Sequence, residues 1–105
     1  MRAVIAGPDE DGLGAALAAR GVETTRVDGV ATGESLSAAG IDDADLFVLT
    51  TMSDATAIAI AKDRNPDLRI VTYAHDSLPE YARGQADLAV DPDLLEATVV
   101  AEELT

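Results

Sequence analysis

Short apolar runs alternate with amphipathic or alanine-rich stretches along the whole chain. Five runs have the length and composition of strands: Arg2–Ala6, Val22–Val27, Leu46–Thr50, Leu68–Ala74 and Asp87–Val90. The third run is continuously apolar, which predicts a strand that is buried on both faces. Helical spacing and helix-end signals predict helices at residues 13–20, 33–39 and 54–64, a short one after residue 77, and one after residue 91.

The last two helices are placed by their start signals. Residues 77–80 read Ser-Leu-Pro-Glu, which is the S-x-x-E form of a capping box. Asp91 is followed by Pro92, so an N-cap residue precedes a proline at the first helical position. The helix that begins there is expected to carry on its inner face Leu94, Leu95, Thr98 and Val99.

The alternation predicts an α/β fold. Strand–helix units with short connections form a parallel sheet with helices on both faces, here a three-layer, doubly wound, five-stranded sheet. The length of 105 residues predicts a single domain over residues 1–105. Ligands of such sheets bind beyond the carboxyl ends of the strands, at the point where the strand order reverses.

The charge is far from balanced. Twenty acidic residues face seven basic ones, Lys62 is the one lysine, and the formal net charge is −13. Self-repulsion destabilises such a compact state at low salt, and molar salt shortens the screening length to about 3 Å. We therefore expect a halophile's high-salt cytoplasm as the location, with Lys62 facing solvent and Arg69 and Arg83 in surface ion pairs.

Composition also excludes several functions. Phosphate contacts need clusters of lysine and arginine, so nucleic-acid binding is not expected. The chain has no cysteine, which excludes disulfides, thiolate metal sites and cysteine nucleophiles. No apolar run is long enough for membrane insertion, and the first residues lack an export signal.

The first turn has the most informative pattern. An apolar strand enters a glycine turn that opens an alanine-rich helix, which is the layout of a dinucleotide-binding turn. Its candidate cofactor-binding residues are Gly7, Pro8, Asp9, Gly12 and Gly14. Asp9, Glu10 and Asp11 nevertheless stand where a pyrophosphate would sit. Two alternatives stay open: the turn holds a nucleotide, or these acids cap the helix that follows.

Further candidates lie at other strand ends. Asp28 is a candidate ribose ligand or a turn residue, and Thr50 and Thr51 belong to a ligand loop or to a helix cap. His75 stands beside Asp76 where a general acid–base could work, but a lone histidine is usually structural. No nucleophile–base pair is apparent, so neither catalytic residues nor a metal site is predicted.

Several motifs resemble the TrkA N-terminal (RCK N) domain of potassium-uptake regulators. The similar segments, which cover about two thirds of the chain, are residues 36–50, 61–71, 74–76 and 84–92, with the first turn matching more loosely. The resemblance implies a Rossmann-like domain that binds NAD(H) or ATP and gates ion transport. It also implies that Asp28 holds the ribose.

The chain departs from that family in three places. The family turn is Gly-x-Gly-x-x-Gly, and here Gly7 and Gly12 keep the outer positions while Asp9 replaces the middle glycine. Tyr73 replaces an arginine that is usual in the fourth strand. One strand–helix unit is missing between residues 28 and 36, and removing that edge unit from the order 3-2-1-4-5-6 predicts the order 2-1-3-4-5.

These features favour a non-catalytic regulatory module that binds a nucleotide, NAD(H) or another small ligand, or that has lost this ability. The alternative is a partner-interaction or assembly domain, with a second copy (a homodimer) or a separate effector chain as partner. A small nucleotide-related enzyme is least favoured. Short haloarchaeal proteins of similar appearance carry the label "CTP synthetase", but the chain has neither a glutaminase cysteine nor a G-x-x-x-x-G-K-[ST] loop. A receiver domain is disfavoured, since Thr50 replaces the phosphoacceptor aspartate.

Overall fold

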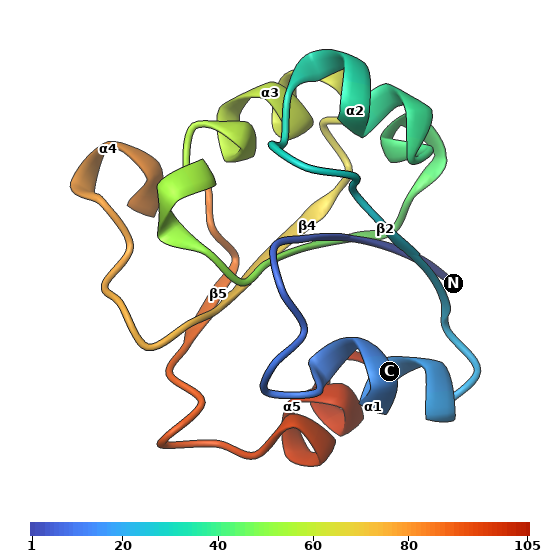
Figure 1. The fold of residues 1–105 in the computed structure, drawn as a ribbon, viewed down its shortest axis with the longest axis vertical. Helices are drawn as coiled ribbons and strands as arrows, with labels where there is room; N and C mark the ends of the chain where they lie inside the picture. Colours follow the sequence, from blue (N-terminus) through green and yellow to red (C-terminus); the bar gives the residue numbers. More distant parts are fainter.

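In the computed structural model, which describes residues 1–105, a parallel sheet lies between two layers of helices (Figure 1). The sheet has five strands in the order β2-β1-β3-β4-β5, which confirms the predicted order. The strands are β1 Arg2–Ala6, β2 Glu23–Arg26, β3 Leu46–Leu49, β4 Arg69–Tyr73 and β5 Leu88–Val90. The α-helices are α1 Leu13–Ala19, α2 Gly33–Ala38, α3 Ala57–Arg64, α4 Glu80–Arg83 and α5 Ala97–Leu104. Short 3-10 turns cover Ile41–Asp43 and Met52–Asp54.

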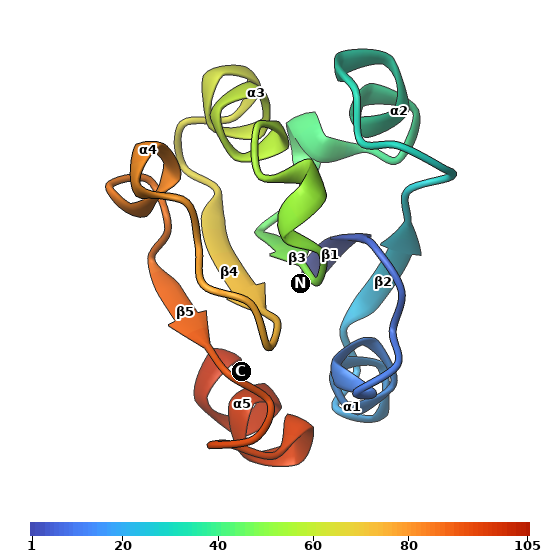
Figure 2. The ribbon, with the colours of Figure 1, turned by 60° about the vertical axis from the view of Figure 1, so that its left-hand side comes forward.

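Each face of the sheet has its own core (Figure 2). Helices α1 and α5 cover one face, and α2, α3 and α4 cover the other. Side chains of β3 alternate between the two cores, as a strand requires: Phe47 and Leu49 point to one side, Leu46 and Val48 to the other. All four are fully buried, which confirms that β3 is central. No helix combines the length and the apolar run that crossing a bilayer requires.

The predicted start of the last helix is wrong. Helix α5 begins at Ala97, and its buried side chains are Val100, Ala101 and Leu104. Asp91 instead accepts a hydrogen bond from the Asp93 N–H at 2.8 Å, so it closes a local turn rather than a helix. The side chains expected on the inner face are all exposed, namely Leu94, Leu95, Thr98 and Val99.

The predicted capping box before α4 is also absent. Helix α4 begins at Glu80, and extended backbone at Pro79 separates it from Ser77. A capping box occurs instead before α2, where the Thr32 side chain accepts from the Ser35 N–H and the Ser35 side chain accepts from the Thr32 N–H.

Three basic side chains differ from expectation. Lys62 is partly buried, and its Nζ donates to the Leu68 carbonyl oxygen at 2.7 Å rather than facing solvent. The Arg83 Nε donates to the Leu78 carbonyl oxygen at 3.1 Å. Neither Arg83 nor Arg69 lies within 4.0 Å of a carboxylate oxygen, so the expected ion pairs are not formed. Acidic residues are abundant on the surface, but no carboxylate lies close enough to form an ion pair with these two arginines.

Candidate functional site

The glycines of the first turn are required by its backbone. Gly7 and Gly12 have φ angles of 100° and 78°, which L side chains rarely adopt. Gly14 is the second residue of α1 and is in close contact with its surroundings: a Cβ there would lie 2.8 Å from Ile5 Cδ1 and 2.9 Å from Asp9 Oδ2. The turn therefore has the compact form that the glycine pattern predicts.

The carboxylate of Asp9 lies at the start of α1. Its Oδ1 accepts the Gly14 N–H at 2.8 Å, and its Oδ2 accepts the Ala15 N–H at 3.2 Å. The first N–H groups of a helix have no partner within the helix, and these are the donors that bind phosphate in dinucleotide-binding turns. Of the two alternatives left open by the sequence, the geometry favours the helix cap, and Asp9 alone among the three acids provides it.

Other side chains bind the carbonyl groups of the same turn. Thr50 Oγ1 lies 2.6 Å from the Pro8 carbonyl oxygen and 3.2 Å from that of Ala6, across the switch point between β1 and β3. Arg26 at the end of β2 donates through Nη2 to the Gly7 carbonyl oxygen at 2.8 Å. Hydrogen bonds within the chain thus cross the point where the strand order reverses.

The remaining candidates are divided between two hollows. A groove of about 440 Å³ lies beside the turn, and its lining includes Gly7, Pro8, Arg26 and Thr51. Asp28 lines a separate, smaller hollow next to α2. The structure therefore brings Thr51 toward the first turn and leaves Asp28 in another hollow. Thr51 bonds to the Ser53 hydroxyl at 2.8 Å, and no side chain caps α3.

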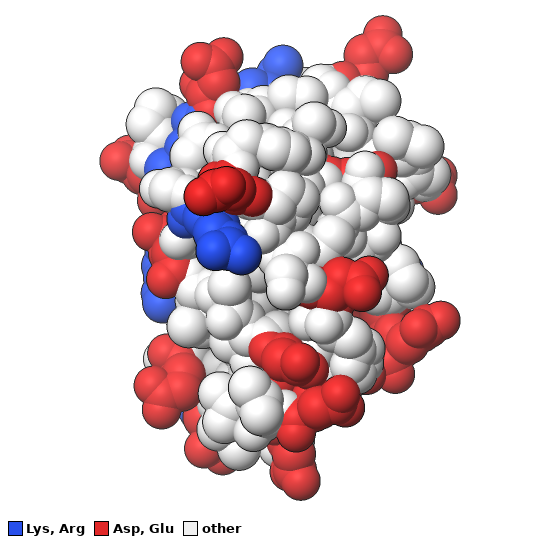
Figure 3. All heavy atoms as spheres, turned by 90° about the vertical axis from the view of Figure 1, so that its left-hand side faces the viewer, with Lys and Arg blue, Asp and Glu red and all other residues white.

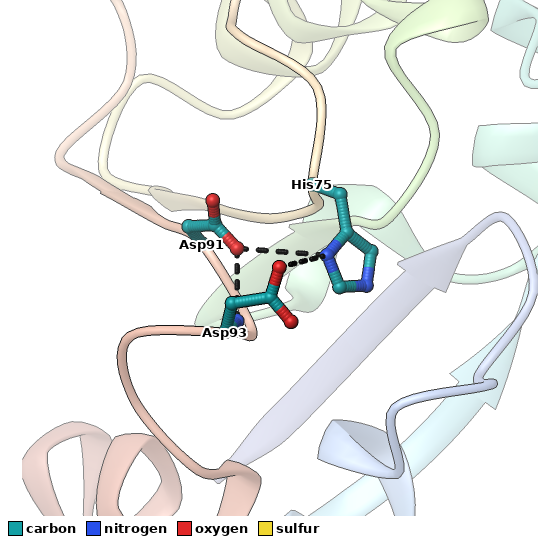
Figure 4. Close-up of side chains that lie close together, drawn as sticks. All are labelled: His75, Asp91 and Asp93. Carbon is teal, nitrogen blue, oxygen red and sulfur yellow. Dashed lines mark hydrogen bonds and ion pairs between the residues drawn. The ribbon is translucent and has the colours of Figure 1, made fainter.

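The one histidine of the chain lies among acids from other loops (Figure 4). His75 follows β4, and its Nδ1 lies 3.2 Å from Asp93 Oδ2 and 3.6 Å from Asp91 Oδ1, both in the loop after β5. Its Nε2 lies 3.5 Å from Asp11 Oδ2 in the first turn. We call His75, Asp11, Asp91 and Asp93 the histidine cluster. Asp76, the sequence neighbour expected beside the imidazole, is not one of its partners.

The acids of the histidine cluster favour the protonated form of the His75 imidazole. The hydrogen bond to Asp93 raises the pKa of His75 above its ordinary value, and the charges of Asp93 and Asp11 act in the same direction, while desolvation opposes them. The hydrogen-bond partner of His75 is the carboxylate of Asp93 and not a hydroxyl group. An imidazole and carboxylates are, however, ligand types that metal ions use.

Tyr73 links the end of β4 to the segment before α5. Its side chain is 2% exposed, and its hydroxyl donates to the Leu95 carbonyl oxygen at 2.7 Å. Burial raises its pKa above 10.0, and the nearby charges of Asp11 and Glu96 add to this effect. At the position where the TrkA N-terminal family usually has an arginine, this chain has Tyr73, whose hydroxyl forms a hydrogen bond to the chain's own backbone.

Part of the histidine cluster could be predicted and part could not. Asp91 and Asp93 lie two residues apart at a strand end, as a pair of ligands can, but Asp91 followed by Pro92 also has the residues of a helix start. Asp11 and His75 are far apart in sequence, and only the parallel order brings the loops after β1 and β4 together. No local pattern in the sequence indicates that these two loops meet.

A family model described as "Family of unknown function (DUF7126)" matches residues 3–104. The chain belongs to this family. No curated protein matches the DUF7126 chain.

Solved structures share the fold of the DUF7126 chain at low sequence identity. An orphan response regulator of H. pylori has a TM-score of 0.72 at 15% identity, covering 99% of this chain and 92% of that one. The TrkA-N domain of the inner membrane protein ybaL from Escherichia coli has a TM-score of 0.69 at 23% identity, covering 99% and 96%. A protein described as pilus assembly-related from Burkholderia pseudomallei has a TM-score of 0.68 at 18% identity, covering 99% and 86%. At these identities the likeness shows a Rossmann-like α/β fold and nothing finer.

Proposed function

We propose that this DUF7126 chain is a non-catalytic regulatory or assembly domain that acts by contacting another protein chain and holds no nucleotide at its first turn. The similar folds are described as response regulators, a TrkA-N domain and a pilus assembly-related protein, which supports the regulatory or assembly class. His75 is hydrogen-bonded to a carboxylate rather than to a hydroxyl, which supports a role without covalent catalysis.

The observation that carries the proposal is the position of the Asp9 carboxylate. A pyrophosphate at the start of α1 would have to displace it from two backbone N–H groups, at 2.8 and 3.2 Å. Charge-assisted bonds of this kind are about twice as strong as neutral ones. The displaced carboxylate would then stand beside the phosphates, together with Glu10 and Asp11, and like charges at such distances repel.

The contact surface that the structure supports best lies along β5 and α5. A groove of about 430 Å³ runs there, and its lining includes Leu88, Leu95 and Val99. Leu95 and Val99 are 42% and 38% exposed although they are aliphatic. Strand β5 is also an edge of the sheet, where backbone groups are open to another chain. Figure 3, which views the molecule from the side of α4 and β5, shows acidic side chains scattered over this face, with basic side chains among them and uncharged areas between.

An amide-resolved NMR titration tests the proposal. The chain would be titrated with NAD(H), ATP and CTP in about 2 M KCl, which screens its self-repulsion. We expect no saturable shifts at the amides of Gly7, Gly14 and Ala15. Saturable shifts at these three amides would overturn the proposal, because they would place a nucleotide at the start of α1.

A second candidate function is a small-ligand regulatory module, and one observation favours it. The groove of about 440 Å³ beside the first turn contains Arg26, the one basic residue of its lining. A small anion there would meet the guanidinium without displacing Asp9. In the same titration, saturable shifts confined to Gly29 and Thr51 would favour this function over the first.

A further inference from the structure

The histidine cluster places three ligand atoms as a metal site would. His75 Nδ1 and one carboxylate oxygen each from Asp91 and Asp93 lie within 4.8 Å of one another. Ligands about 2.0–2.1 Å from a tetrahedral metal are separated by about 3.3 Å. The distances from Nδ1 to the two carboxylate oxygens are 3.2 and 3.6 Å, close to that separation.

The other ring nitrogen is arranged as a ligating histidine requires. Histidine ligands almost always donate the N–H of their free nitrogen to a carboxylate, a carbonyl or water, which fixes the ring orientation. His75 Nε2 faces Asp11 Oδ2 at 3.5 Å, from the opposite side to Asp91 and Asp93. Asp11 therefore stands where a positioning carboxylate would stand if Nδ1 bound a metal.

An independent observation comes from the adjoining cavity. His75 and Asp91 line a cavity of about 170 Å³, and Thr72 lines it as well. Thr72 is 3% exposed, and apart from Tyr73 it is the one buried residue with a polar side-chain atom. Its hydroxyl bonds to no protein group, whereas every fully enclosed side-chain oxygen of the protein has a partner. The hydroxyl is therefore not fully enclosed, and it lies at the wall of the cavity, where water or a bound group can partner it.

We propose that His75, Asp91 and Asp93 form a binding site for a divalent first-row transition metal, with an open coordination position toward the cavity of Thr72. One imidazole nitrogen with two carboxylate oxygens suits zinc, cobalt or manganese better than magnesium or calcium, which prefer oxygen ligands throughout. Water occupies about 30 Å³ in the liquid, so a cavity of about 170 Å³ has room for metal-bound water beside the Thr72 hydroxyl. Such a metal would join the loops after β4 and β5.

Cobalt is the probe for the first experiment, because its visible spectrum and paramagnetism report its ligands. The metal-free chain in about 2 M KCl would be titrated with CoCl2 by calorimetry and by amide-resolved NMR. We expect one-to-one binding, with paramagnetic broadening centred on residues 75, 91 and 93. Absence of saturable binding, or broadening spread over the acidic surface without a centre at His75, would overturn the proposal. MgCl2 at the same concentration is expected to bind far more weakly.

Variants separate ligation from general attraction to an acidic surface. His75→Gln and Asp93→Asn should each weaken cobalt binding at least about tenfold. Asp63→Asn on α3 removes the same charge as Asp93→Asn outside the cluster, and it should leave the affinity unchanged. Equal losses in Asp63→Asn and Asp93→Asn would contradict the proposal. Far-UV circular dichroism of each variant, and the NMR broadening in the natural chain, keep loss of folding apart from loss of a ligand.

A separate variant tests whether the open coordination position faces the cavity of Thr72. Thr72→Val keeps the side-chain shape and removes the hydroxyl, so it should weaken cobalt binding by about tenfold, as other outer partners of metal ligands do. An unchanged affinity would show that the open coordination position does not face Thr72.

Discussion

The carboxylate of Asp9 accepts the N–H of Gly14 at 2.8 Å, five residues further along the chain. This bond places an acid of the first turn at the start of α1, where dinucleotide-binding turns hold a phosphate. The glycines on either side keep the compact turn, with a φ of 78° at Gly12. The turn thus has the backbone form of a nucleotide site, but its anion is the chain's own Asp9 carboxylate.

The capping bonds of Asp9 should contribute to stability. Asp9→Ala removes the acceptor for Gly14 and Ala15, and loss of such a cap costs about 0.5–2 kcal/mol. Denaturant unfolding in molar KCl would measure the difference. Glu10→Ala is the matched control, because Glu10 is exposed and bonds to nothing, and it should change the free energy of unfolding by less than about 0.5 kcal/mol. Equal effects of the two substitutions would show that the cap is not formed in solution.

The free energy of unfolding should rise with salt. A net charge of −13 with one lysine produces self-repulsion in the compact state, and salt screens it. Thermal melts in about 0.1 M and about 2 M KCl provide the measurement, and we expect the higher melting temperature in the stronger salt. Equal or lower stability in the stronger salt would contradict the account of the acidic surface.

Stability should fall at alkaline pH through Tyr73. Burial raises the pKa of Tyr73 above 10.0, so its contribution is fully present below pH 10.0 and is lost as the pH rises through the folded-state value. Tyr73→Phe should reduce this alkaline loss, and at neutral pH it should cost about 0.5–1.5 kcal/mol through the bond to Leu95. Urea unfolding from pH 8 to 11 measures both effects. Tyr81→Phe is the control, since Tyr81 is 67% exposed and should leave the profile unchanged; an alkaline loss that is the same in all three chains would refute the role of Tyr73.

The sheet could be predicted from the sequence because its signals are local and strong. The continuous apolar run of β3 indicates burial on both faces, and Phe47 and Val48 are indeed in different cores. The end of the chain could not be predicted in the same way. Asp91 followed by Pro92 has the residues of a helix start, but the Asp91 side chain bonds to the Asp93 N–H and closes a turn.

The candidate sites show a similar division. The position of Asp9 between two glycines indicates that this acid competes with a phosphate, and in the structure its carboxylate accepts the Gly14 and Ala15 N–H groups. The histidine cluster was not apparent, because its partners come from loops that follow three different strands, and their distances depend on strand order and loop conformation. The hydroxyl of Thr72 also gave no signal, since threonine is common in strands and only its burial makes it unusual.

The most direct measurement of the central claim is calorimetry of NADH with the natural chain and with Asp9→Gly, in matched molar KCl. The account predicts no saturable heat for the natural chain. It predicts stronger binding by Asp9→Gly, because the Gly14 and Ala15 N–H groups are then free and a repelling charge is gone. Tight binding by the natural chain, unchanged or weakened by Asp9→Gly, would contradict it and would mean that Asp9 does not occupy the place of the phosphate.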